Sequence, residues 1–184
     1  RDLPQLMAES REGIERVTRI VRDLKDFSYS GRDESWKLVD LHAGLESTIN
    51  IIWNELKYKV TLERRYGELP MIECLPSELN QVYMNLLLNA GHAIADRGNI
   101  VVSTGVGGDE VWVEFKDDGA GISPELRQRI FDQFFTTKPV GSGTGLGLSI
   151  SYGIVNKHHG RIDLDSTVGE GSCFRIVLPI RQPK

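Results

Sequence analysis

The chain has 184 residues, enough for one medium-sized domain with its own core, or for such a domain with a short appendage. Its 22 Lys and Arg against 26 Asp and Glu give a formal net charge of −4, which disfavours binding to nucleic acid or to an anionic membrane surface. Apolar runs such as residues 86–88 are far shorter than the roughly 18 residues of a membrane span, so we expect neither a transmembrane helix nor a signal peptide in this sequence. Cys74 and Cys173 have the spacing of neither a disulfide framework nor a zinc site, and they fit a reducing cytoplasm.

The first thirty residues differ in pattern from the rest. Between residues 3 and 27, apolar side chains recur three, four or seven positions apart, at Met7, Ile14, Val17, Val21 and Leu24. This narrow stripe predicts an amphipathic helix that packs against a partner helix, and the alternative is a helix lying on the core of its own domain. A polar stretch at 28–35 follows, so we divide the chain into a helix at 1–30, a linker at 31–36 and a main domain at 37–184.

The main domain alternates between helical and extended patterns. Asp40 is a predicted helix cap, and Pro76 begins a long helix that we expect to end near residues 96–98. Further helices are predicted from Ser123 and over 146–158. The predicted strands are 58–62, 100–103, 111–115, 161–165 and 172–179, with the second and third joined as a hairpin. The pattern indicates a mixed α/β domain whose last hairpin is antiparallel.

A line of polar side chains follows one face of the helix that begins at Pro76. Its members are Gln81, Asn85, Asn89 and His92. The other faces are apolar, so the line must face a cavity, a ligand or water, because an unpaired buried amide is costly. Amide oxygens can complete the ligand shell of a Mg²⁺ ion that already carries phosphate oxygens. The alternative is that Asn85 and Asn89 only satisfy backbone groups.

An acidic residue and two glycines come directly after the predicted strand 111–115. Asp117 can accept a hydrogen bond from an exocyclic amine, and Gly119 and Gly121 let a flat group lie against the backbone. Taken alone, this spacing is also typical of an ordinary glycine-rich turn.

A glycine-rich tract at 141–149 leads into the helix predicted at 146–158. Successive amides at a helix start form an anion cradle, and glycines let phosphates approach it. The tract is neither a Walker loop nor a dinucleotide fingerprint, since no Lys-Ser/Thr pair follows its last glycine and Leu occupies position 146. Upstream, aromatic residues at 131, 134 and 135 precede Lys138, which suggests a lid whose aromatics pack down while Lys138 reaches a phosphate. The alternative for Lys138 is a solvated surface charge.

Taken in order, these motifs resemble the N, G1, F and G2 boxes of the ATP-binding domain of sensor histidine kinases. The resemblance covers about residues 37–180, and Gly169 to Phe174 are similar to that family's last glycine box. It implies the two-layer α/β sandwich with a mixed sheet, the Bergerat-type fold, that the family shares with gyrase B, MutL and the heat-shock chaperone ATPases of the GHKL superfamily. Here that fold would follow one amphipathic helix.

The resemblance also implies roles for individual residues. Asn89 matches the Mg²⁺ ligand, with Asn85 in support, and Asp117 matches the acceptor of the adenine amine. Gly119 and Gly121 would shape the base pocket. The implied ATP-binding set is completed by His92, Lys138, Gly143, Thr144, Gly145, Leu146, Gly147 and Ser172.

The implied activity is transfer of the γ-phosphoryl group of ATP to a histidine, for relay to a response regulator. Residues 1–30 resemble the second helix of the family's dimerisation hairpin, which implies a homodimer. None of the four histidines precedes Glu or Asp as the acceptor does, so we expect the acceptor helix to lie outside this chain; they are His42, His92, His158 and His159. We read the pair at 158 and 159 as helix-terminal or surface residues. The domain would be cytoplasmic, and the sequence leaves open a membrane anchor in a longer protein.

Two other functions fit the same ATP boxes. A GHKL-type ATPase needs a general base, yet Asn85 stands where those relatives have Glu, so hydrolysis should be slow. A non-catalytic, nucleotide-sensing dimerisation module remains the second alternative. An anti-sigma-factor serine kinase also shares the boxes, but the N-terminal stripe favours the histidine kinase.

Overall fold

The computed structural model describes residues 35–138 and 143–183, with six isolated positions nearer the N-terminus: 7, 10, 11, 13, 14 and 18. The predicted helix at 1–30 therefore lies almost wholly outside the described residues, and of the predicted linker at 31–36 only residues 35 and 36 are described. Of the predicted stripe, only Met7 and Ile14 are described, and both are largely exposed. Within the described part of the chain, no helix is long and apolar enough to cross a membrane.

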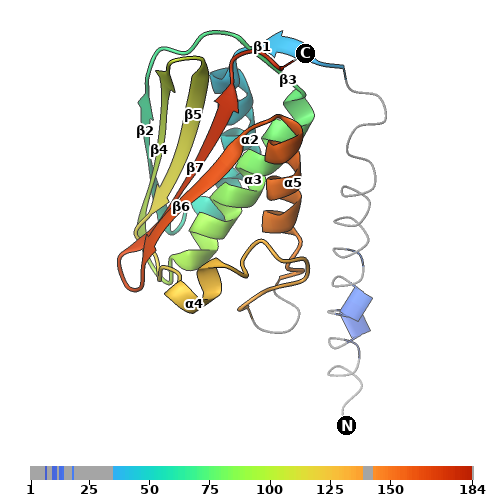
Figure 1. Ribbon diagram of the computed structural model, residues 1–184. Coiled ribbons are helices and arrows are strands. Elements are labelled where there is room, and N and C mark those ends of the chain that lie inside the picture. Colours follow the sequence, from blue (N-terminus) through green and yellow to red (C-terminus); the bar gives the residue numbers. More distant parts are fainter. Residues whose placement is uncertain are drawn as a thin grey trace.

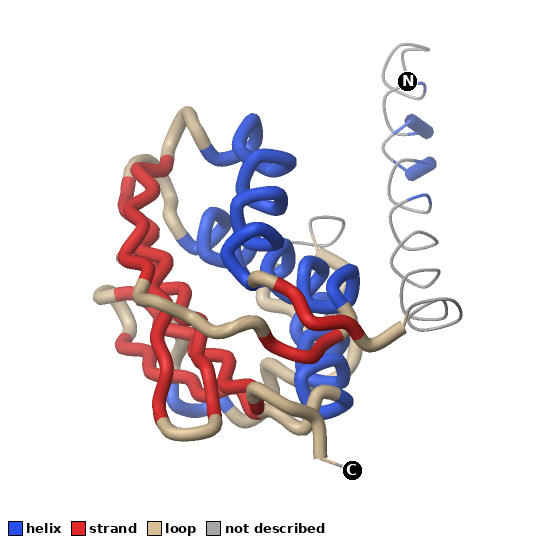
Figure 2. The backbone as a smooth tube through the Cα atoms, turned by 90° about the horizontal axis from the view of Figure 1, so that it is seen from above, coloured by secondary structure: helices blue, strands red, loops and turns tan. Residues whose placement is uncertain are grey.

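Two layers make up the main domain: a five-stranded sheet and three helices on one of its faces (Figures 1 and 2). The strands lie in the order β2 (Val60–Tyr66), β4 (Gly98–Gly107), β5 (Glu110–Asp117), β7 (Gly171–Pro179) and β6 (Arg161–Thr167). The covering helices are α2 (Leu41–Leu56), α3 (Pro76–Ala93) and α5 (Gly147–Lys157). Strands β2 and β4 run parallel and the other pairs antiparallel, so the predicted mixed-sheet sandwich is confirmed.

The core lies between the two layers. Alternate residues of β4, β5 and β7 are buried, as expected where one face of a sheet is covered by helices. The helices contribute residues at helical spacing, for example Leu45, Ile49 and Ile52 of α2. Burial of each such side chain contributes about 1.5–3 kcal/mol to folding.

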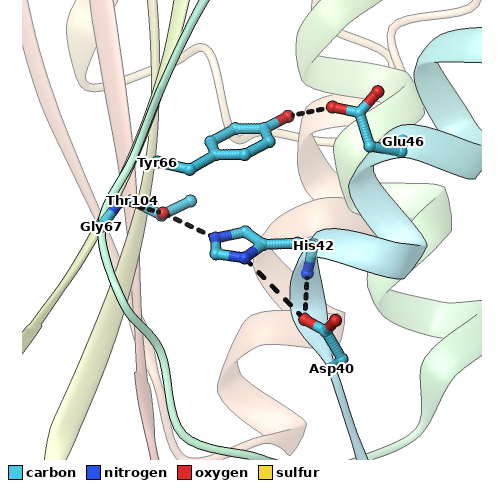
Figure 3. A network of polar contacts seen from close by, with 6 residues as sticks. All are labelled: Asp40, His42, Glu46, Tyr66, Gly67 and Thr104. Atoms are coloured by element: carbon cyan, nitrogen blue, oxygen red, sulfur yellow. Dashed lines mark hydrogen bonds and ion pairs between the residues drawn. The ribbon is translucent and has the colours of Figure 1, made fainter.

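A polar network fixes the start of α2 to the sheet (Figure 3). Asp40 caps the helix as predicted, by accepting a hydrogen bond from the His42 amide at 2.9 Å. The His42 ring stacks on Tyr66 of β2, and its Nε2 lies 2.8 Å from Thr104 Oγ1 of β4. Tyr66 in turn donates to Glu46 of α2 at 2.7 Å. The network holds α2 against the ends of β2 and β4.

The structure also differs from the expected boundaries. Helix α3 ends at Ala93, before the predicted 96–98, because the Ala93 carbonyl accepts from the Ala120 amide and Lys59 Nζ donates to the Ile94 carbonyl. A two-stranded antiparallel sheet of β1 (Lys37–Val39) and β3 (Ile72–Cys74) was not predicted. The helix beginning after Ser123, α4 (Pro124–Arg127), is a single turn.

Candidate functional site

Asp117 lies at the end of β5, beside β4 and β7. Its side chain is buried, and its Oδ1 accepts hydrogen bonds from the Gly119 amide at 2.9 Å and the Ser172 amide at 3.3 Å. Burial raises the pKa of this carboxyl, although both amide bonds oppose the shift. Both of these hydrogen bonds end on Oδ1 and not on Oδ2.

The glycines after Asp117 bring the backbone into close contact with two other segments. A Cβ at Gly119 would lie 2.6 Å from the Ala93 carbonyl oxygen at the end of α3. Gly121 has φ +71°, and a Cβ there would overlap the Thr167 carbonyl. The turn at 117–121 therefore fits between α3 and the β6–β7 turn only without side chains at these two positions.

The two asparagines of α3 have different surroundings. Asn85 Nδ2 donates to the Gly147 carbonyl at 3.0 Å and to Ser151 Oγ at 3.2 Å, which joins α3 to the first turn of α5. Asn89, one turn further along, lies with its Oδ1 3.5 Å from Lys138 Nζ. The alternative that these asparagines satisfy backbone groups therefore holds for the NH₂ group of Asn85, which donates to a backbone carbonyl. Asn89 instead faces the segment that carries Lys138.

Lys138 reaches back to the last turns of α3. Besides Asn89, its Nζ lies 3.0 Å from His92 Nδ1, and its amide donates to Thr136 Oγ1. Burial lowers the pKa of the Lys138 ammonium, and the charge of Lys59 lowers it further. Lys138 is therefore not a solvated surface charge.

The aromatic and glycine-rich segments are bonded to each other. The Phe134 amide donates to the Gly145 carbonyl at 3.0 Å, and a Cβ at Gly145, whose φ is +70°, would overlap the Phe134 backbone. Phe131 and Phe135 pack against the core as predicted, but Phe134 is 63% exposed, so only two of the three predicted anchors pack down. Residues 139–142 of the predicted lid lie outside the described residues.

The remaining predicted residues of this region occupy different positions. Gly143 lies beside Thr136 and Lys138, and Gly147 begins α5. Leu146 is buried in the core, so its side chain has a structural role. Thr144 lies between Gly143 and Gly145, partly buried.

Ser172 lies behind Asp117 and supports it. Its Oγ lies 2.9 Å from Ser166 Oγ, both side chains are buried, and only its backbone amide contacts the carboxylate. Ser166 also accepts from the Ile122 amide, and so holds the turn after Asp117. Ser166 and Lys59 are not predicted from the sequence, because nothing in their local sequence marks residues that act across the fold.

The types of side chain in this region determine which ligands it can bind. The described residues contain no cluster of three or more His, Cys, Asp or Glu side chains able to bind a metal ion. The amide oxygens of Asn85 and Asn89 are neutral, so they fit Mg²⁺ only when phosphate oxygens supply the negative charge. A buried acceptor at Asp117 and an ammonium at Lys138 fit the base and the phosphates of a nucleotide.

Comparison with known proteins identifies the family. Residues 74–182 match the family model described as histidine kinase-, DNA gyrase B- and HSP90-like ATPase. The chain therefore belongs to this ATPase family.

Individual relatives are kinases by name. The chain is 36% identical over 170 residues to the signal transduction histidine-protein kinase AtoS of Escherichia coli (strain K12), covering 91% of this chain and 28% of AtoS. It is 41% identical over 116 residues to sporulation kinase E of Bacillus subtilis (strain 168), covering 62% of this chain and 15% of that kinase. Among solved structures, the nucleotide-free catalytic domain of histidine kinase ThkA superposes with a TM-score of 0.73 at 26% identity, over 80% of this chain and 97% of that domain. The chain thus spans less than a third of the length of AtoS and of sporulation kinase E.

Proposed function

We propose that this chain is the ATP-binding catalytic part of a two-component sensor histidine kinase, and that it transfers the γ-phosphoryl group of ATP to a histidine on a dimerisation helix. The observation that carries this proposal is the contact of Lys138 with Asn89 and His92 of α3, in a domain that also buries the Asp117 carboxylate. The names of its relatives support the same activity.

The adenine base would bind at the end of β5. Asp117 Oδ2 would accept a hydrogen bond from the exocyclic amine, while the Gly119 and Ser172 amides hold Oδ1 in place. The close backbone packing at Gly119 and Gly121 holds this turn against the end of α3 and against Thr167, which would keep Asp117 in position for the base.

The phosphates would bind near the last turns of α3. Lys138 supplies the positive charge, and a phosphate would restore the ordinary tendency of its ammonium to stay protonated. Asn89 would hold Mg²⁺, with the Asn85 oxygen in support. When bound, Mg²⁺ neutralises phosphate charge and orients the γ-phosphoryl group.

The environment of Asn85 favours transfer over hydrolysis. Its NH₂ group is engaged by Gly147 and Ser151, and an amide oxygen cannot take a proton from water at neutral pH. A neutral histidine nitrogen needs no such base, so positioning and Mg²⁺ supply most of the catalysis.

The acceptor would belong to a different helix. His158 is fully buried, with Nε2 accepting from the Leu75 amide and Nδ1 2.8 Å from the Ile154 carbonyl, so it is not accessible to a phosphoryl group. We propose that residues 1–30 form the second helix of the hairpin that pairs in a homodimer, that a response regulator receives the phosphoryl group, and that the domain works in the cytoplasm, where ATP is available.

The test combines this chain with a polypeptide that carries the acceptor helix and its partner helix. With γ-labelled ATP and Mg²⁺, we expect acid-labile, base-stable label on the acceptor, strongly reduced by Asn89→Ala. Brisk ATP hydrolysis without transfer would instead indicate a GHKL-type ATPase. Tight ATP binding with neither reaction would indicate a nucleotide-sensing module.

A further inference from the structure

The segment between α4 and Lys138 is folded into consecutive turns. Its backbone amides donate to carbonyls three or four positions earlier, from Ile130 to Leu126, from Asp132 to Arg129 and from Phe135 to Asp132. Ile130 is buried in the core and anchors the first of these turns. Arg129 and Phe135 therefore belong to one compact piece of backbone.

A cation–π contact joins these two residues. The guanidinium of Arg129 lies over the Phe135 ring, 4.7 Å from the ring centroid. Phe135 is partly buried against the core, whereas Arg129 is exposed. Within the part of the chain that the structure describes, no carboxylate forms a salt bridge with Arg129. The described contact of this charge is therefore with the ring.

Phe135 lies only three positions before Lys138. A fully extended chain spans at most about 3.6 Å per residue, so the two Cα atoms lie within about 11 Å of each other. The Lys138 amide also donates to Thr136 Oγ1 at 3.1 Å, which adds a turn to this short connection. A displacement of Phe135 would therefore change the position from which the Lys138 ammonium reaches His92 Nδ1 at 3.0 Å and Asn89 Oδ1 at 3.5 Å.

We propose that Arg129 is a positioning residue for the phosphate side of the nucleotide site. Its guanidinium fixes the Phe135 ring, and the ring fixes the point from which Lys138 reaches the end of α3. This role rests on the proposed function, in which Lys138 binds the phosphates of ATP. Arg129 itself would not touch the nucleotide.

Calorimetry with ATP and with adenosine tests this role. Arg129→Gln should weaken ATP binding by about two- to fivefold, as expected for the loss of an exposed cation–π contact, and should leave adenosine binding unchanged. Arg129→Lys keeps a cation for the ring and should retain most of the ATP affinity. Arg175→Gln is the matched control, because it removes the same kind of contact, with Trp112 at 4.7 Å, and should bind ATP as the wild type does.

A double-mutant cycle tests whether Arg129 acts through the ring. Phe135→Leu removes the ring and keeps an apolar side chain. In the Phe135→Leu background, Arg129→Gln should therefore cause almost no further loss of ATP affinity, because the contact that it removes is already absent.

A second measurement does not need ATP. In ¹H–¹⁵N NMR spectra of the full chain without nucleotide, Arg129→Gln should shift the Asn89 side-chain amide signals in the same direction as Lys138→Met does, because both variants move the ammonium away from Asn89. A wild type that binds no ATP would refute the proposed function, and the spectra would still decide the positioning role.

The positioning role is overturned if Arg129→Gln leaves the Asn89 signals or the ATP affinity unchanged. It is also overturned if Arg129→Gln weakens ATP and adenosine equally, or if its effect on ATP is the same with and without the Phe135 ring.

Discussion

The Lys138 ammonium lies 3.0 Å from His92 Nδ1, although the two residues are separated by 46 positions in the sequence. This contact joins the segment after the aromatic residues to the end of α3, where Asn89 also lies. Burial and the charge of Lys59 both disfavour the protonated form of Lys138. An anion bound beside Lys138 would relieve this cost.

Lys138→Met should therefore weaken ATP binding and leave adenosine binding nearly unchanged. Methionine keeps an unbranched side chain of similar length and removes the ammonium, with its charge and its hydrogen-bond donors. Hydrogen bonds to charged groups contribute about 1.5–3 kcal/mol, which corresponds to at least a tenfold loss of ATP affinity by calorimetry. Lys116→Met, on the exposed face of β5, serves as the control and should bind both ligands as the wild type does. Equal losses for ATP and adenosine would show that Lys138 acts on the fold of the site and not on phosphate.

Asp117→Asn should reduce affinity for both ATP and adenosine by about tenfold or more, because the neutral amide is a weaker acceptor for the base. The matched control is Asp118→Asn, because Asp118 accepts from the Asn99 backbone amide and side chain and not from the adenine in our assignment. Unchanged calorimetric affinity in Asp117→Asn would refute the assignment of the base pocket.

The raised pKa of Asp117 predicts a pH dependence of binding. As the pH falls through this raised value, Oδ2 takes up a proton and no longer accepts from the base, so ATP affinity should fall at a higher pH than an ordinary aspartate would give.

The effect of acid on the stability of the fold has the opposite sign to its effect on ATP binding. A raised folded-state pKa means that the ionised carboxylate opposes folding at neutral pH, and that this cost disappears as the pH falls. Asp117→Asn should therefore bind ATP poorly without a loss of thermal stability, and its binding should lack the acid transition of the wild type.

Asn85→Asp should destabilise the domain by about 1–3 kcal/mol. The carboxylate cannot donate to the Gly147 carbonyl or to Ser151 Oγ as the amide does, and it faces that carbonyl with like charge. Urea denaturation measures the loss. Gln81→Glu, one turn earlier on the same face of α3, should change stability by much less. Equal stability of Asn85→Asp and the wild type would mean that Asn85 does not join α3 to α5.

Two glycines of the β6–β7 turn give a matched test of close packing. Both have positive φ, +82° at Gly169 and +105° at Gly171, but only at Gly171 would a Cβ overlap the Asp117 carbonyl. Gly169→Ala should cost about 1–2 kcal/mol, the conformational cost alone. Gly171→Ala should cost clearly more in thermal denaturation, and it should also weaken ATP binding, because it displaces the backbone that carries Asp117. Similar losses in both variants would contradict the packing described for Asp117.

Local sequence determined much of the fold and most candidate residues. The 3.6-residue spacing in α2 and α3, the Asp40 cap, and the hairpin of β4 and β5 follow from side-chain periodicity and turn residues that act within a few positions of one another. The asparagines of α3, Asp117 with its glycines, and Lys138 were also identifiable, because each belongs to a compact pattern whose chemistry suits a nucleotide.

Only the tertiary structure decided how these residues are used. Contacts between segments far apart in the chain determine three features of the site. Asn85 donates two hydrogen bonds to α5, Ser172 contacts Asp117 through its backbone amide and not through its side chain, and Leu146 is buried. The same is true of the early end of α3 and of the pairing of β1 with β3. Periodicity reports which face of an element is apolar, but it does not report which distant group meets that face. The free energy of those contacts is set by packing and hydrogen bonds that exist only once the layers have assembled.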